Sequence, residues 1–396
     1  MHGTEITNKL IVRKAAAGPS INNLLAPVRK LSDSEKNFLA SRTDADAERP
    51  KTKEAETEIQ IDGRIVLVSR IISPRETVSV AYTEDFEYLA GGYADGIIRM
   101  YRSDNSEPSH KLVDPEVTRS PVTCIKHRPT SKSYPISNTL TCTYTNGCVK
   151  CWNYNFNQCV YTIREKRQTY GLTYHPRLPK FVTYGDDMNI YMYDEETRTQ
   201  ERTLTKSDNP NAHDGHTSRI YAACFNPRSN HEVCTGGWDN VVQFWDLRQP
   251  HAIRHIGGVH ICGEGIDINQ KGTELITCAF QKDKSIQHWD YPSGKLIKNV
   301  EPDIHQSKLY CGKYVGKDFF VCGGTDPNIL RFFDIGMGFT KCLVQDLPTA
   351  VYGLDLGPPP KINPANRNAP IQKNELTGVP KIAVAAGKGL FQFEPK

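Results

Sequence analysis

Residues 215–248 read GHTSRIYAACFNPRSNHEVCTGGWDNVVQFWDLR, and this stretch decides the fold. It holds three short apolar runs, which begin at Ile220, Val233 and Val241. An Asn-Pro pair separates the first two runs, and a Gly-Gly pair followed by Trp-Asp-Asn separates the last two. Apolar runs this short, interrupted by turn-forming residues, predict β-strands rather than a helix. We therefore expect three consecutive strands joined by turns.

Gly-His at the beginning of this stretch, Trp-Asp at its end and one Asp in the turn between resemble a repeat of the WD40 family of β-propellers. A four-stranded blade is too thin to bury its own faces, so blades stack around a central axis. The resemblance implies a hydrogen-bonded set made of His216, Thr235, Asp239 and Trp245. These residue types also suggest a catalytic triad, but each is occupied in holding the blade, and we expect no catalytic residue.

Six further repeats align with this one, which predicts an all-β, seven-bladed WD40-type β-propeller. The equivalent third-strand aromatics recur every 40 to 60 residues or so, a spacing that suits blades with variable loops. They are Tyr101, Trp152, Tyr193, Trp245, Trp289, Phe333 and Phe393. Only the fourth repeat shows the whole polar set, so apolar packing has to hold most of the ring. We expect residues 59–70, as an N-terminal strand, to complete the last blade and close the ring.

Residues 1–57 differ from the rest of the chain in composition. They contain a single aromatic residue, Phe38, and end in a charged run. Such a segment cannot bury enough apolar surface to fold alone. We expect a mostly disordered tail with linear docking motifs over 1–57 and one propeller domain over 58–396.

Composition limits the classes of function. The chain has 396 residues, a formal net charge of +4 and twelve cysteines. A charge this small does not indicate a nucleic-acid partner. The start is polar, without a signal-peptide pattern, and no run approaches the ~18 apolar residues of a membrane span. We expect a reduced intracellular protein without a membrane partner. The cytoplasm is the first expectation, and the nucleus and the cytoskeleton or cilium are alternatives.

Motifs for chemistry are weak. Cys148 and Cys151 form a C-x-x-C, but residues three apart on a strand point to opposite faces, so we expect no metal site. The glycine pairs lie at strand ends and open no helix, which disfavours a phosphate loop. We expect neither a cofactor nor an enzyme.

The remaining hypothesis is protein binding. A rigid ring presents loops on both faces, and exposed aromatic and arginine side chains anchor partners. The candidates are Trp238, Arg219, Tyr93 and Phe280, with Trp238 first because it lies in a turn that faces the partner side in this family.

We expect a non-catalytic scaffold, a monomeric ring within a larger multiprotein assembly, that binds proteins or peptides through its loops and tail. The alternative is a substrate receptor of a cullin–RING ubiquitin ligase. Trp245-Asp246-Leu247-Arg248 resembles the WDxR box of such receptors, in which the arginine helps to bind the adaptor. An arginine at a strand end also commonly pairs with a neighbouring acid, so Arg248 leaves both functions open.

Overall fold

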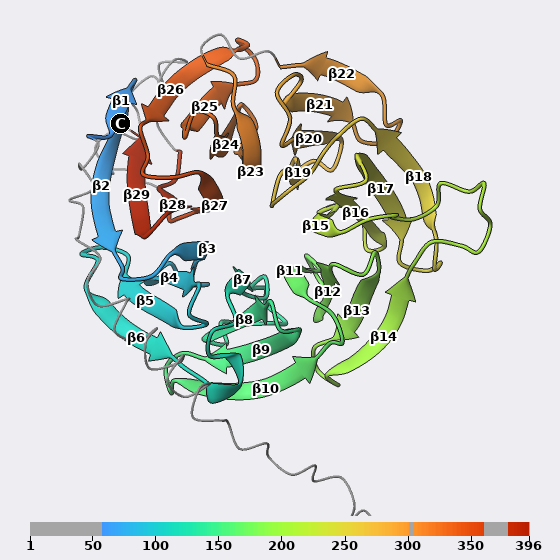
Figure 1. The fold of residues 1–396 in the computed structure, drawn as a ribbon, viewed down its shortest axis with the longest axis horizontal. Helices are drawn as coiled ribbons and strands as arrows, with labels where there is room; N and C mark the ends of the chain where they lie inside the picture. Colours follow the sequence, from blue (N-terminus) through green and yellow to red (C-terminus); the bar gives the residue numbers. More distant parts are fainter. Residues whose placement is uncertain (1–57, 301–304, 360–378, 396) are drawn as a thin grey trace, which may run out of the picture. The chain divides into compact units, whose positions relative to one another are not determined.

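A computed structural model describes residues 58–300, 305–359 and 379–395. These residues form seven antiparallel sheets, six of four strands and one of five, arranged as blades around an axis (Figure 1). The architecture confirms the expected seven-bladed β-propeller. The expected tail, residues 1–57, lies outside the described residues.

The strands take four positions in the blades. The first strands, nearest the axis, are β3 (Thr77–Tyr82), β7 (Val122–Lys126), β11 (Thr169–Tyr174), β15 (Ile220–Phe225), β19 (Ile266–Ile268), β23 (Lys308–Val315) and β27 (Val351–Leu356). The second strands are β4 (Tyr88–Tyr93), β8 (Thr139–Tyr144), β12 (Lys180–Gly185), β16 (Glu232–Gly237), β20 (Glu274–Cys278), β24 (Phe319–Thr325) and β28 (Ile382–Ala386). The third strands are β5 (Ile98–Arg102), β9 (Cys148–Asn153), β13 (Ile190–Asp194), β17 (Val241–Asp246), β21 (Ile286–Asp290), β25 (Leu330–Asp334) and β29 (Gly389–Pro395). The outer strands are β6 (Pro108–Leu112), β10 (Gln158–Arg164), β14 (Thr199–Leu204), β18 (Ala252–Gly257), β22 (Leu296–Asn299), β26 (Phe339–Gln345) and β2 (Ile65–Ile72).

The turns between second and third strands share one backbone requirement. In each of them one residue has a positive φ, which favours glycine or asparagine because other side chains are strained there. Glycine and asparagine occupy four of the seven positions: Gly96, Gly147, Asn240 and Gly387. The other three are Met188, Lys284 and Asp326. In most blades the turn residue thus suits the turn that joins the second and third strands.

The ring closes through the N-terminal strands. β2 pairs antiparallel with β29, from Ile65 opposite Pro395 to Ile72 opposite Gly389, and so supplies the outer strand of the last blade. This pairing confirms the expected closure. In addition β1 (Gln60–Asp62) pairs with β26 and gives the sixth blade its fifth strand. The segment that closes the ring therefore joins two blades.

The hydrophobic core is divided among the interfaces between blades. The described residues contain seven apolar clusters, and each lies at one interface. Trp152 of the second blade packs with Met100 of the first, and Trp289 of the fifth with Phe244 of the fourth. The aromatic residue that marks each repeat in the sequence is thus the residue that binds a blade to the preceding one, by burying a large apolar area.

Cysteines contribute to these interfaces. All twelve are free thiols, and nine of them are buried. Cys142 and Cys234, for example, lie in second strands within apolar clusters. Their use as small hydrophobic residues agrees with the expectation from the sequence.

Candidate functional site

A recurring irregularity places side chains at one end of the axis. In six of the seven first strands the register shifts by one residue near the start of the strand. A β-bulge of this kind leaves one residue out of the pairing and turns its side chain in a new direction. The residues at these positions are Val78, Thr123, Tyr170, Tyr221, Tyr310 and Tyr352. Four of the six are tyrosines.

The seventh first strand, β19, is shorter, and the chain before it reaches the axis instead. This segment is Cys262-Gly263-Glu264. A Cβ on Gly263 would lie 2.5 Å from the Tyr310 carbonyl oxygen, so only glycine allows this close approach.

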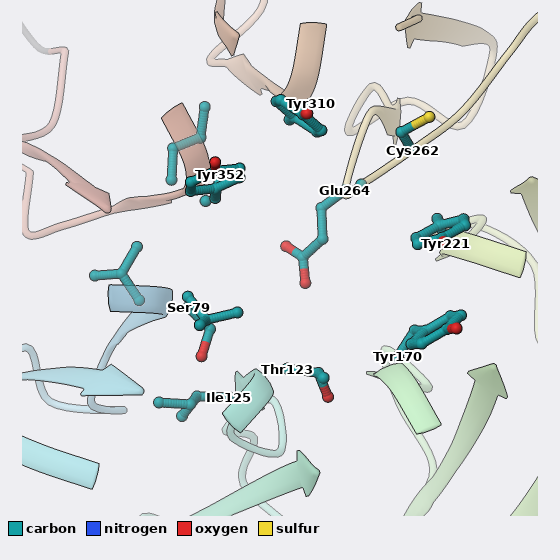
Figure 2. A pocket seen from close by; sticks show the side chains of 14 residues that line it. Ser79, Thr123, Ile125, Tyr170, Tyr221, Cys262, Glu264, Tyr310 and Tyr352 are labelled. Carbon is teal, nitrogen blue, oxygen red and sulfur yellow. The ribbon is translucent and has the colours of Figure 1, made fainter. Parts of the chain in front are cut away.

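Together these residues surround a cavity of about 190 Å³, which we call the channel mouth (Figure 2). Its lining draws on all seven blades and is mostly aromatic and aliphatic. The rings of Tyr170 and Tyr221 are stacked, with their centres 4.8 Å apart. The rings of Tyr310 and Tyr352 are tilted relative to each other, with their centres 5.2 Å apart. Burial and the neighbouring Tyr221 raise the pKa of Tyr170 to about 12, so its phenol is neutral at physiological pH.

Glu264 extends into the channel mouth between the two tyrosine pairs (Figure 2). Its Oε2 accepts a hydrogen bond from Lys126 Nζ at 2.7 Å, and its Oε1 lies 3.2 Å from the Cys124 thiol. Burial alone would raise the pKa of Glu264, but the ammonium groups of Lys126 and Lys313 outweigh it and keep the pKa below its ordinary value. The carboxyl group is therefore ionised at neutral pH.

A second cavity, of about 230 Å³, meets the channel mouth at Glu264. Its lining is more polar and includes Lys126, Asp267 and Lys313. Lys313 is itself paired with Asp355 at 2.6 Å. Glu264 thus separates an aromatic mouth from a deeper cavity that contains two lysines.

Two of the predicted partner-binding residues lie at the rim of the channel mouth. Trp238 is 44% exposed and stacks on Tyr221, with ring centres 5.6 Å apart. Its Nε1 donates a hydrogen bond to Cys262 Sγ at 3.0 Å. The exposed Arg219 lies over the indole, 5.3 Å from its centre. A third predicted residue, Phe280, extends this aromatic surface, with its ring centre 4.9 Å from that of Tyr310.

The prediction for Tyr93 is wrong. Its side chain is 0% exposed, because Tyr93 is the last residue of β4 and packs at the interface between the last and the first blade. Its hydroxyl lies 3.3 Å from that of Tyr101, and the Arg99 guanidinium lies 4.5 Å from its ring centre. Tyr93 therefore stabilises the ring and is not available to a partner.

Arg248 is exposed but lies away from the channel mouth. It follows β17, whereas Trp238 precedes that strand, so the two residues lie at opposite ends of it. Its guanidinium is held by Asp246, through Nη2 at 2.6 Å and Nε at 2.9 Å. Arg248 therefore pairs with a neighbouring acid, as an arginine at a strand end commonly does.

The four residues of the blade set are joined by hydrogen bonds. His216 Nδ1 lies 2.8 Å from Asp239 Oδ2, and its Nε2 lies 2.7 Å from Thr235 Oγ1. Trp245 Nε1 donates to the same hydroxyl at 2.8 Å. Because Thr235 is fully buried, no substrate can reach its hydroxyl. The geometry supports the blade, and the Thr235 hydroxyl is not accessible as a nucleophile.

The third blade contains an ionic version of this set, which was not predicted from the sequence. Arg167 takes the place of the histidine and donates to Asp187 Oδ1 at 2.6 Å and to Thr183 Oγ1 at 2.8 Å. Glu165 accepts from Arg167 at 2.7 Å and from Tyr193 at 2.9 Å. The side chains of Arg167 and Glu165 are almost completely buried, so each charge depends on the other.

The tyrosines and Glu264 were also missed, although the sequence contains a signal for the tyrosines. In four repeats a tyrosine near the start of the first strand is followed by a small residue, as in Thr169-Tyr170-Gly171 and Val351-Tyr352-Gly353. Strand alternation alone does not reveal that these tyrosines converge.

The described part of the chain has neither a cluster of metal ligands nor a membrane-spanning helix. Within it, no group of three or more histidine, cysteine or acidic side chains could hold a metal ion. The same residues include no helix long and apolar enough to cross a membrane.

Comparisons with known proteins agree with the architecture. Residues 209–246 match the family model "WD domain, G-beta repeat". The "Ribosome biogenesis protein WDR12 homolog" of Culex quinquefasciatus is 25% identical over 176 residues, 41% of this chain and 40% of that protein. The protein of the same name from Anopheles gambiae is 25% identical over 175 residues, 41% and 39% of the two chains. The "Anaphase-promoting complex subunit cdh1" of Dictyostelium discoideum is 30% identical over 102 residues, 25% and 12% of the two chains.

These alignments span about 40% or less of the length of the curated relatives. The matched repeat includes the four residues of the blade set and residues 215–246, but not Leu247 and Arg248. Seven antiparallel blades surround the axis. The chain is a WD40-repeat β-propeller.

Proposed function

We propose that the chain is a non-catalytic scaffold subunit of a multiprotein assembly and that the channel mouth is its main partner surface. The observation that carries this proposal is the convergence of four bulged tyrosines and the half-exposed Trp238 at one end of the axis. A few residues carry most of the binding energy at protein interfaces, and tryptophan and tyrosine are enriched among them.

The comparisons favour an assembly subunit over the ubiquitin-ligase receptor. Three relatives are named as ribosome biogenesis proteins and one as an anaphase-promoting complex subunit. None of these four relatives is named as a cullin–RING receptor, and the Arg248 guanidinium is held by Asp246. Ribosome biogenesis is therefore the first assembly to test, and it fits the nuclear alternative better than the cytoplasm. Microscopy of a fluorescent fusion tests the compartment.

Affinity capture from the source cells tests the scaffold. Wild-type protein is compared with Trp238→Ala, which removes the rim aromatic, and with Phe156→Ala, which removes a 72% exposed aromatic from a turn on the outer side of a blade. We expect partners to be lost with Trp238→Ala and kept with Phe156→Ala. A version lacking residues 1–57 shows whether the tail contributes. If no stable partner is captured by the wild type, the scaffold proposal is wrong.

A further inference from the structure

We propose that the channel mouth binds an arginine side chain of the protein partner, with the guanidinium group at Glu264 between the two tyrosine pairs (Figure 2). This inference rests on the proposed function, because it assumes a protein partner. It adds the chemistry by which that partner is recognised.

The charge of the site selects a cation. Of the described residues that line the channel mouth, Glu264 alone is charged at neutral pH, and the others are tyrosine, serine, threonine, cysteine, glycine and aliphatic residues. Tyrosine faces carry negative potential and attract cations, so the aromatic walls and the carboxylate favour the same sign of charge. An anion would meet repulsion from Glu264 before it reached the lysines of the deeper cavity.

Glu264 has an oxygen that can accept a stronger donor. Its Oε2 is occupied by Lys126, but among the described residues its Oε1 accepts only from the Cys124 thiol, which is a weak donor. A carboxylate offers about four acceptor positions, so a guanidinium N–H can bind Oε1 without displacing Lys126. The Glu264 side chain is 31% exposed and can be reached from the mouth.

The shape of the site favours arginine over lysine. A guanidinium is flat, weakly hydrated and stacks on aromatic faces, whereas an ammonium is compact and strongly hydrated. The paired rings Tyr170–Tyr221 and Tyr310–Tyr352 flank Glu264 on two sides (Figure 2). A cavity of about 190 Å³ accommodates one such side chain and ends where Lys126 and Lys313 would repel a second cation. The expected ligand is therefore one arginine at the tip of a loop or peptide.

Calorimetric titration tests the inference. The probe is the acetylated, amidated peptide Gly-Ser-Gly-Arg-Gly-Ser-Gly, compared with versions that carry citrulline or lysine in place of arginine. We expect the arginine peptide to bind saturably at millimolar concentration or below. Loss of a charge-assisted hydrogen bond weakens binding by about tenfold to a hundredfold, so the citrulline peptide and the variant Glu264→Gln should both lose at least tenfold.

Matched controls separate binding from folding. Glu201 forms an ion pair with Lys180 at 2.7 Å and at nearly the same exposure as the Glu264–Lys126 pair, so Glu201→Gln should leave peptide affinity unchanged. Tyr352→Ala removes a half-exposed ring from the mouth and should weaken binding by about twofold to thirtyfold. The thermal unfolding midpoint of each variant shows that the ring is intact.

Three results would overturn the inference: no binding of the arginine peptide to wild-type protein, equal binding of the citrulline peptide, or binding of the lysine peptide within threefold of arginine. Affinity capture then separates this failure from failure of the scaffold proposal. If wild-type protein captures partners that Glu264→Gln also keeps, the scaffold stands and the arginine inference fails. If the peptide binds but no partner is captured, the site recognises arginine and the scaffold proposal fails.

Discussion

Replacing Asp239 by alanine tests how much one polar set contributes to the ring. The change removes the acceptor for His216 Nδ1 at 2.8 Å and for the backbone N–H of Thr217 at 3.0 Å. His216 is 1% exposed, so its ring nitrogen loses its partner without gaining water. A stranded buried group costs about 1–3 kcal/mol and a more exposed hydrogen bond about 0.5–1.5 kcal/mol. We expect Asp239→Ala to lower the free energy of unfolding by about 2–4 kcal/mol.

The assay is urea unfolding followed by tryptophan fluorescence, with the dependence on urea unchanged between variants. The control is Asp95→Ala at the equivalent turn of the first blade, where the acid pairs with Arg99 and both side chains are about one-fifth exposed. That pair should contribute about 1 kcal/mol or less. In a double-mutant cycle, His216→Ala should cost less once Asp239 is already alanine. A loss below about 0.5 kcal/mol for Asp239→Ala, or one equal to that of Asp95→Ala, would refute the reasoning.

Three further predictions concern the ring. Arg167→Ala should lower the free energy of unfolding by about 3–5 kcal/mol, because it leaves the buried carboxylate of Glu165 without its ion-pair partner. The control is Lys180→Ala, which breaks the more exposed pair with Glu201 and should cost about 1 kcal/mol or less in the same urea assay. Of the described elements, removal of residues 1–62 deletes only the exposed strand β1, and this should leave a folded ring. Removal of residues 1–72 also deletes β2 and should give an aggregating chain on size-exclusion chromatography. A monomeric, cooperatively folding 73–396 fragment would contradict this prediction. Burial alone would raise the pKa of Asp239, but its hydrogen bonds to His216 and Thr217 hold that pKa below the ordinary 3.8. The contribution of Asp239 to the free energy of unfolding is therefore present above about pH 4 and is lost as the pH falls further. Asp239→Asn should flatten this part of the stability–pH curve, and an unchanged slope would argue against the lowered pKa.

Much of the fold could be predicted because its determinants are local. Strand periodicity, turn residues and one aromatic residue per third strand lie within single repeats, and together they indicate seven blades. The closing strand was also predictable, because an exposed sheet edge has to be covered. The fifth strand β1 was not, since three exposed residues show no alternation of polar and apolar side chains.

The candidate site was only partly predictable. Trp238 and Phe280 stand out as aromatic residues next to turns, and both lie at or beside the channel mouth. Tyr93 has the same local signature, but the adjoining blade covers it completely. Exposure depends on the neighbouring blade, and the residues of a single repeat do not reveal it.

The sequence by itself determined the repeat, the number of blades and the residues that hold the fourth blade, because each depends on neighbours within one repeat. Only the tertiary structure decided that tyrosines from four blades meet around Glu264. Tyr170 and Tyr352 are far apart in the chain and become neighbours of one cavity because the ring closes and a bulge in each first strand turns the side chain toward the axis. Closure of the ring is a property of all seven blades together, and it is what converts a repeated local irregularity into a single site.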